Sequence, residues 1–178
     1  MSFDPFTENA APFTSIKQAT DYLEQACGRF GAENLSYWSV RLLDGLPDEV
    51  TWIATYSPEY MSHYMRSYTP AEDPIFTGAA LKRFVIDWSD LNATGAIAQS
   101  IHAEAKKYGI STHGLSFPFR SQSGSSILFS ATANCTDAQW PERRRTLAIE
   151  LHLFAHHFHL RADPLVNAGR MNMVSVAA

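Results

Sequence analysis

The sequence predicts an α/β protein, an α/β/α sandwich with a central, mainly antiparallel five-stranded sheet and helices on both faces. Segments rich in β-branched and aromatic residues come in two adjacent pairs, each joined by a turn-forming stretch, as in antiparallel hairpins. Segments with apolar residues at helical spacing precede, separate and follow these pairs, which supplies helices for both faces. The length of 178 residues fits one domain.

The first elements are a helix and a hairpin. Residues 14–30 carry apolar side chains at helical spacing, and Gly31 is the expected stop. Residues 35–43 and 50–56 are rich in β-branched and aromatic types. The intervening segment D-G-L-P-D-E therefore predicts a hairpin.

Two steps ending in proline mark the next helices. Ser57 is the predicted N-cap of a helix whose first turn contains Pro58. Asp73-Pro74 repeats this pattern and predicts a helix over about 74–82.

A short strand and a fourth helix follow. Residues 84–88 predict the third strand. Residues 92–108 predict a helix that ends at Gly109, with a stripe formed by Ile97, Ile101, Ala105 and Tyr108.

The C-terminal part predicts a second hairpin and a long helix. Residues 112–120 and 125–133 pair around Ser123-Gly124, and Thr136 is expected to cap a helix that reaches about residue 162. We expect an N-terminal extension over 1–13, a small-molecule-binding domain over 14–165 and a tail over 166–178. That tail is too short for a helix-turn-helix, so an excised receptor domain and a naturally short protein are both open.

Composition argues against several classes of protein. A hydrophobic fraction of 46% and a charged fraction of 18% are typical of globular chains. The net charge of −4 provides no basic field for nucleic acid. Cys27 and Cys135 form no CxxC pair and are expected to be reduced core residues. With neither a signal peptide nor a run of about 18 apolar residues, a soluble cytoplasmic protein is expected.

The stretch 56–88 predicts a binding chamber. It combines tyrosine hydroxyls, one aspartate and one indole N–H with apolar side chains, which suits a small, mostly apolar molecule with a polar head. Tyr60 and Tyr64 are four residues apart and share a helix face. Asp73 is either an N-cap or a carboxylate that accepts an N–H from a ligand. Trp88 is either plain core or a donor at the site.

These residues resemble the autoinducer-binding domain of LuxR-type quorum-sensing regulators over about residues 14–165. That family carries a W-x3-Y pair on a helix, then a D-P step, a tryptophan after a short strand and a glycine that opens a later strand. The corresponding features here are Tyr60 and Tyr64, Asp73-Pro74, Trp88 and Gly114. The tyrosine in place of the family's first tryptophan is the one departure.

The resemblance implies an N-acyl homoserine lactone as ligand and assigns roles to side chains. Asp73 would accept the amide N–H, Tyr56 would donate to the acyl carbonyl, and Ser130 would reach the acyl carbonyls. Trp88 would close the lactone end, and Tyr64 would contact the head group. The expected ligand-binding residues are Tyr56, Tyr60, Tyr64, Asp73, Trp88, Ser130, Gly114, Trp52, Phe76 and Leu128.

The departure at Tyr60 leaves another amphiphile, such as a pyrone or an aryl compound, as an alternative ligand. Period two along the strands places Trp38 and Trp52 at the tail region, which predicts a crowded pocket that favours a short or flat acyl group. The resemblance also implies a homodimer and contact with DNA only through a separate C-terminal domain. A generic sensory or scaffolding domain, whose aromatic cluster is only core, is the alternative from another class.

Other signals predict no catalysis, cofactor or metal. His152, His156 and His159 share a helix face and could in principle hold a metal, but they are better explained as the polar flank of a core stripe. Residues 143–145 are three consecutive arginines, interpreted as surface charge. The sequence contains no nucleophile elbow, phosphate loop or dinucleotide turn.

Overall fold

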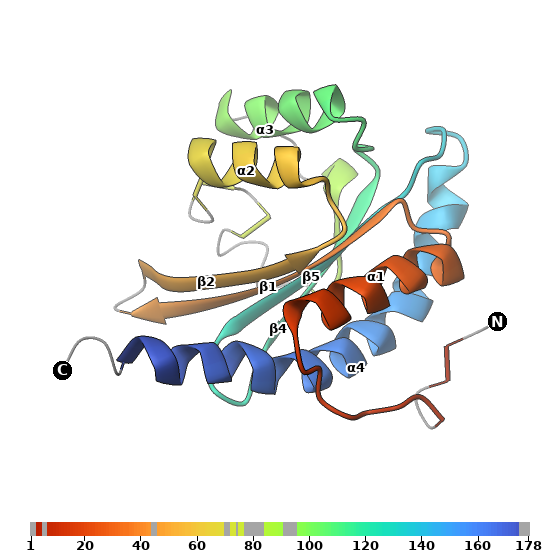
Figure 1. The fold of residues 1–178 in the computed structure, drawn as a ribbon. Coiled ribbons are helices and arrows are strands. Elements are labelled where there is room, and N and C mark those ends of the chain that lie inside the picture. Colours follow the sequence, from red (N-terminus) through yellow and green to blue (C-terminus); the bar gives the residue numbers. More distant parts are fainter. Residues whose placement is uncertain are drawn as a thin grey trace.

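The computed structural model describes residues 3–4, 7–43, 46–69, 72–73, 75–76, 84–90 and 96–174. These form a three-layer sandwich around a five-stranded antiparallel sheet in the order β2-β1-β5-β4-β3 (Figure 1), as predicted. Helices α1 and α4 cover one face, and α2 and α3 cover the other. The elements are α1 (Ile16–Phe30), β1 (Asn34–Leu43), β2 (Leu46–Ala54), α2 (Pro58–Ser67), β3 (Ile86–Asp87), the 3₁₀ helix η2 (Trp88–Asp90), α3 (Ala96–Lys107), β4 (Gly114–Arg120), β5 (Ser126–Thr132) and α4 (Trp140–Val174).

Local signals in the sequence account for several boundaries. The Ser57 side chain accepts a hydrogen bond from the Tyr60 backbone N–H, which caps α2 as predicted. Helix α1 ends at Gly31, whose φ of 62° lies in the left-handed region that glycine adopts without strain. Gly124 has a φ of 85° in the second hairpin.

The strand register divides the side chains between two cores, one on each face. Tyr37, Phe117 and Phe129 point toward α1 and α4, where they pack with Phe154 and Phe158. The alternate positions on the same strands face α2 and α3, because successive side chains point to opposite faces. Ser36 pairs with both Ala54 and Ser130, and Trp38 pairs with both Trp52 and Leu128. The predicted facing of these strands is therefore confirmed.

Some boundaries differ from the prediction. The strand predicted over 84–88 is shorter, Ile86–Asp87, because the chain turns into η2 at Trp88. The helix predicted over 92–108 is described from Ala96, and Ile97 and Tyr108 are exposed instead of joining its buried stripe. The helix predicted over 74–82 lies mostly outside the described residues.

Helix α4 is longer than predicted and begins later. Residues 136–139 form a turn that the Gln139 side chain closes by accepting from the Thr136 N–H and hydroxyl, so the helix starts at Trp140. It then continues past residue 162 and through Pro164 to Val174. No helix among the described residues has the length and hydrophobicity needed to cross a membrane.

The arginine run is not simple surface charge, so that interpretation is wrong for two of its members. The Arg143 guanidinium donates to the backbone carbonyls of Phe30 and Gly31 at the end of α1. Arg144 pairs with the Asp87 carboxylate on β3. Arg143 therefore connects α4 to α1 and Arg144 connects it to the sheet, which the sequence could not show because both partners are distant along the chain.

The histidines of α4 make ring contacts. His152 lies over Phe84 with ring centroids 4.1 Å apart, and His156 lies over Phe119 at 4.2 Å. The Nδ1 atom of His159 is 3.0 Å from the Tyr37 hydroxyl.

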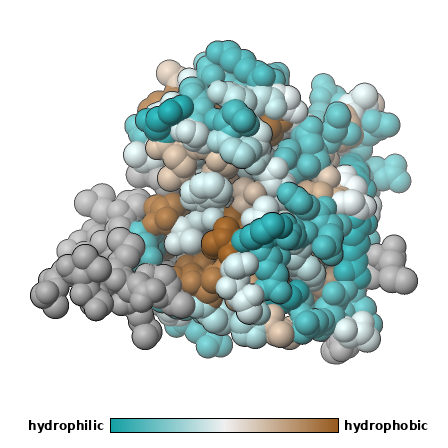
Figure 2. Space-filling view, in the orientation of Figure 1, coloured by the Kyte–Doolittle hydropathy of each residue, from teal (hydrophilic) through white to brown (hydrophobic). Residues whose placement is uncertain are grey.

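Figure 2 shows one face of the molecule, where hydrophilic residues cover α1 and a hydrophobic group lies over the β2 edge of the sheet.

Candidate ligand-binding cavity

A cavity of about 50 Å³ lies between the sheet and the layer formed by α2 and α3. Strands β1 and β5 supply one wall and the two helices supply the other, while the sides are closed by Asp73, Ile75, Phe76 and Trp88. The wall is mostly aromatic and aliphatic, with a few polar groups. The lining residues are Ser36, Trp38, Tyr56, Tyr60, Met61, Tyr64, Asp73, Ile75, Phe76, Trp88, Ile101, His102, Ala105, Ile110, Leu128 and Ser130.

Asp73 is a buried carboxylate, 3% exposed, on this cavity. Its Oδ2 atom accepts from the Tyr64 hydroxyl at 2.6 Å, and its Oδ1 atom accepts from the Ile75 backbone N–H at 2.9 Å. Burial raises its pKa, and these two hydrogen bonds oppose that rise. When ionised, a carboxylate has about four acceptor positions, and the described residues use two of them on Asp73. Asp73 thus bonds locally to the backbone, as an N-cap would, and also faces the chamber.

The two tyrosines of α2 lie on its buried face, as their spacing predicts. Tyr60 is 8% exposed and Tyr64 is 5% exposed, and both line the cavity. Burial raises the pKa of both phenols, and the nearby Asp73 charge raises it further. Both therefore stay protonated donors at neutral pH. The Tyr64 hydroxyl already donates to Asp73.

Tyr56 follows β2 and packs its ring against Tyr60, with centroids 5.4 Å apart. Burial raises its pKa, while a hydrogen bond with the Ser36 hydroxyl opposes the rise. Ser36 also accepts from the Trp38 indole N–H at 3.3 Å. The phenol at Tyr56 is thus a protonated group on the sheet side of the cavity.

Trp88 closes one side of the cavity, and its indole N–H is bonded within the protein. The indole N–H donates to the Ser116 hydroxyl at 2.8 Å, which is in turn 2.8 Å from the Ser130 hydroxyl. Gly114 lies under the ring, because a Cβ atom there would come within 2.4 Å of the indole. Trp88 is therefore held by a hydrogen bond to Ser116 and by close packing on Gly114.

The structure brings together most of the predicted site residues. Eight of the ten line the cavity, namely Tyr56, Tyr60, Tyr64, Asp73, Phe76, Trp88, Leu128 and Ser130. Gly114 lies behind Trp88, and Trp52 stands one strand away and contacts Trp38 at a centroid distance of 6.3 Å. Their roles toward a ligand stay predictions.

Sequence reasoning missed His102 on α3. It lines the cavity beside Ile101 and also borders a second hollow with Gln99 and Lys106. Burial lowers its pKa, and the Asp73 charge opposes this. Helical spacing identified Ile101 and Ala105 as buried, but it gave no sign that the next residue, a histidine, reaches the same chamber.

A mostly apolar chamber with one carboxylate and several hydroxyl groups suits an amphiphilic small molecule. The fold and the cavity thus define a small-molecule-binding domain. The sequence matches the autoinducer binding domain family over residues 15–162. The chain belongs to this family, which supplies the ligand-sensing domain of LuxR-type transcription regulators in quorum sensing and is not a family of enzymes.

Individual relatives agree with this assignment. The transcriptional activator protein RaiR of Rhizobium etli is 30% identical over 108 residues, which cover 61% of this chain and 45% of RaiR. The LuxR family transcription factor CepR2 of Burkholderia cenocepacia has the same fold, with a TM-score of 0.70 at 17% identity over 86% of this chain and 88% of that one. SdiA in complex with octanoyl-rac-glycerol gives 0.68 at 14% identity over 86% of this chain and 61% of that one. The chain thus spans less than two thirds of RaiR and of that SdiA chain.

Proposed function

We propose that this domain senses an N-acyl homoserine lactone-type signal that binds in the cavity and stabilises the folded domain. The observation that carries the proposal is Asp73, a buried carboxylate held by two hydrogen bonds on the wall of an apolar chamber. A charge buried this deeply is costly unless its acceptor positions are used. An amide N–H from the ligand would use one of the positions that the protein leaves.

The remaining polar groups suit the rest of an acylated head group. Tyr56 and Ser130 lie on the sheet side, where a phenol and a hydroxyl can donate to acyl carbonyls. Tyr60 replaces the tryptophan of the family, and its protonated phenol supplies the donor for a lactone carbonyl. Trp88 contributes its ring at the lactone end, since its N–H is bonded to Ser116.

The cavity volume of about 50 Å³ is small beside the about 300–1,000 Å³ of typical small-molecule sites. Binding an acyl ligand therefore requires the cavity to widen. Trp38, with Trp52 and Phe76 packed against it, occupies the tail end. This crowding favours a short or flat acyl group.

A second ligand class has a specific basis. SdiA, which shares this fold, has been seen with octanoyl-rac-glycerol, an acyl ester that has hydroxyl donors and no amide. Tyr60 departs from the family at the head-group end, so an acyl glycerol, a pyrone or an aryl compound is the alternative. We further propose that the regulator is a cytoplasmic homodimer. Its contacts with DNA belong to another domain, because this chain has a net charge of −4.

Thermal unfolding with a graded ligand panel tests the proposal. The panel contains N-acyl homoserine lactones of increasing tail length and octanoyl-rac-glycerol. A ligand at 100 times its Kd stabilises the fold by about 2.7 kcal/mol, so a bound lactone will raise the melting temperature clearly. We expect the rise to be greatest for short tails and to be lost in Asp73→Ala. A panel without any stabilising member, or an unchanged response in Asp73→Ala, would contradict the proposal.

A further inference from the structure

Asp87 and Trp88 are neighbours at the β3 edge that serve opposite faces of the sheet. Trp88 lines the cavity on the side of α2 and α3, whereas Asp87 faces α4. The Asp87 side chain is 9% exposed, and its backbone pairs with Leu115 on β4. The chain therefore passes from an α4 contact to a cavity wall within one peptide bond.

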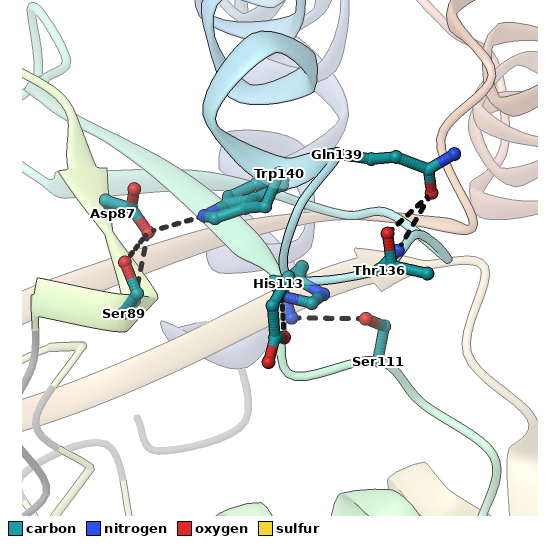
Figure 3. A network of polar contacts seen from close by, with 8 residues as sticks. Asp87, Ser89, Ser111, His113, Thr136, Gln139 and Trp140 are labelled. Carbon is teal, nitrogen blue, oxygen red and sulfur yellow. Dashed lines mark hydrogen bonds and ion pairs between the residues drawn. The ribbon is translucent and has the colours of Figure 1, made fainter.

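Four hydrogen bonds fix the Asp87 carboxylate, and Figure 3 shows those from Ser89 and Trp140. Its Oδ1 atom accepts from the Ser89 backbone N–H at 2.9 Å, the Ser89 hydroxyl at 2.8 Å and the Trp140 indole N–H at 3.2 Å. Its Oδ2 atom accepts from the Arg144 guanidinium at 2.5 Å. Burial alone would raise the Asp87 pKa, but these donors together lower it, so the carboxylate is ionised at neutral pH.

This arrangement brackets Trp88. The bond from the Ser89 N–H to the Asp87 side chain closes a turn around Trp88, so that the backbone on both sides of the indole is held. The ring then lies against Gly114 and donates to Ser116. Displacing the carboxylate would therefore release the turn that aims the indole at the cavity.

The start of α4 contacts the wall at a second point. His113, which precedes Gly114, lies 5.2 Å from the Trp140 ring between centroids, and its Nε2 atom is 3.0 Å from the Asp137 carboxylate. Figure 3 shows His113 and Asp87 on either side of Trp140. Residues 137–144 thus hold both the strand end beneath the indole and the turn that carries it.

We propose that Asp87 and Arg144 are positioning residues for Trp88, so that the first turns of α4 help to set ligand affinity and ligand binding in turn steadies those turns. The ligand part rests on the proposed function. Coupling between two sites is reciprocal. If the contacts of α4 stabilise the Trp88 orientation that binds the ligand, the bound ligand stabilises those contacts by the same free energy.

The adjacent arginine provides a matched control. Arg143→Gln removes hydrogen bonds to the end of α1 and leaves the Asp87 cluster unchanged, whereas Arg144→Gln removes the guanidinium from Asp87. A ligand-free readout comes first. In 5-fluorotryptophan-labelled protein, with signals assigned by Trp→Phe variants, Arg144→Gln will shift the Trp88 resonance and Arg143→Gln will not. Arg144→Lys, which keeps a cation, will partly restore the shift. Equal spectra for the two glutamine variants would overturn the positioning role, whether or not any ligand binds.

Affinity is measured second, by calorimetry with the panel member that stabilises the wild-type protein most. We expect about a 5-fold or greater loss in Arg144→Gln, in the range of typical couplings, and less than 2-fold in Arg143→Gln. In a Trp88→Phe background, Arg144→Gln will have little further effect. Equal losses in the two variants would reduce the contact to general stability. Absence of binding to wild-type protein would contradict the proposed function while leaving the fluorine result intact.

Discussion

Replacing Tyr64 by Phe removes one oxygen and isolates the hydrogen bond that supports the buried Asp73. Its donor and acceptor are 2.6 Å apart, and the carboxylate is 3% exposed. A hydrogen bond to a charged group contributes about 1.5–3 kcal/mol. In the variant, the Ile75 N–H still donates to the Oδ1 atom of Asp73. A cavity of about 50 Å³ can admit a water molecule that donates to the Oδ2 atom. We therefore expect a loss at the lower end, about 1.5–2 kcal/mol, which corresponds to a fall of roughly 3–8 °C in melting temperature.

Thermal unfolding of ligand-free protein at pH 7.5 measures this loss, and Tyr68→Phe is the matched control. The Tyr68 hydroxyl lies 2.8 Å from the Ser100 hydroxyl in an exposed position just after α2. Removing an exposed neutral contact changes stability by about 0.5 kcal/mol or less. Equal melting temperatures for the two variants would refute the reasoning that Asp73 depends on Tyr64.

Three further predictions concern the cavity and its surroundings. Gly114→Ala places a Cβ within 2.4 Å of the Trp88 indole and will lower both the melting temperature and the ligand affinity. Gly28→Ala in α1, where a Cβ would have no atom within 4 Å, will stabilise the protein by about 0.5–1 kcal/mol. Thermal unfolding checks both variants, and a stabilised Gly114→Ala would be contrary to the geometry. Trp38→Leu enlarges the tail end and will shift the best-binding acyl homoserine lactone toward longer tails in a calorimetric series; an unchanged optimum would show that Trp38 does not limit length. Burial lowers the pKa of His102, His152, His156, His157 and His159 below 6.5, so at these five sites the unfolded chain binds more protons as pH drops below about 6.5. Burial raises the pKa of Asp73, which acts in the opposite direction, but five groups outweigh one and stability falls. Melting temperatures from pH 7.5 to 5.5 will show this fall, and His157→Gln will flatten it; a rise on acidification would have the wrong sign.

Local patterns explain why much of the fold could be predicted. The Ser57-Pro58 step caps α2 through its own neighbours, and strand alternation places Trp38 and Ser130 on one face whatever their partners are. Asp73 and Tyr64 were identified by resemblance and helical spacing, and they meet at 2.6 Å.

The remainder depends on contacts that no local pattern records. Arg144 looked like surface charge because its partner, Asp87, is distant along the chain. His102 lines the cavity from α3, although helical spacing marked its neighbour Ile101 as the buried position. The continuation of α4 through Pro164 runs against the preference of proline for helix ends.

The central claim is that Asp73 accepts an amide N–H from the bound signal. A calorimetric cycle tests it most directly: the best-binding N-acyl homoserine lactone and its N-methyl amide are titrated into wild-type protein and into Asp73→Ala. If the carboxylate accepts this hydrogen bond, methylation weakens binding to the wild type by about 10- to 100-fold and has little effect on the variant. The same loss in both proteins would contradict the account.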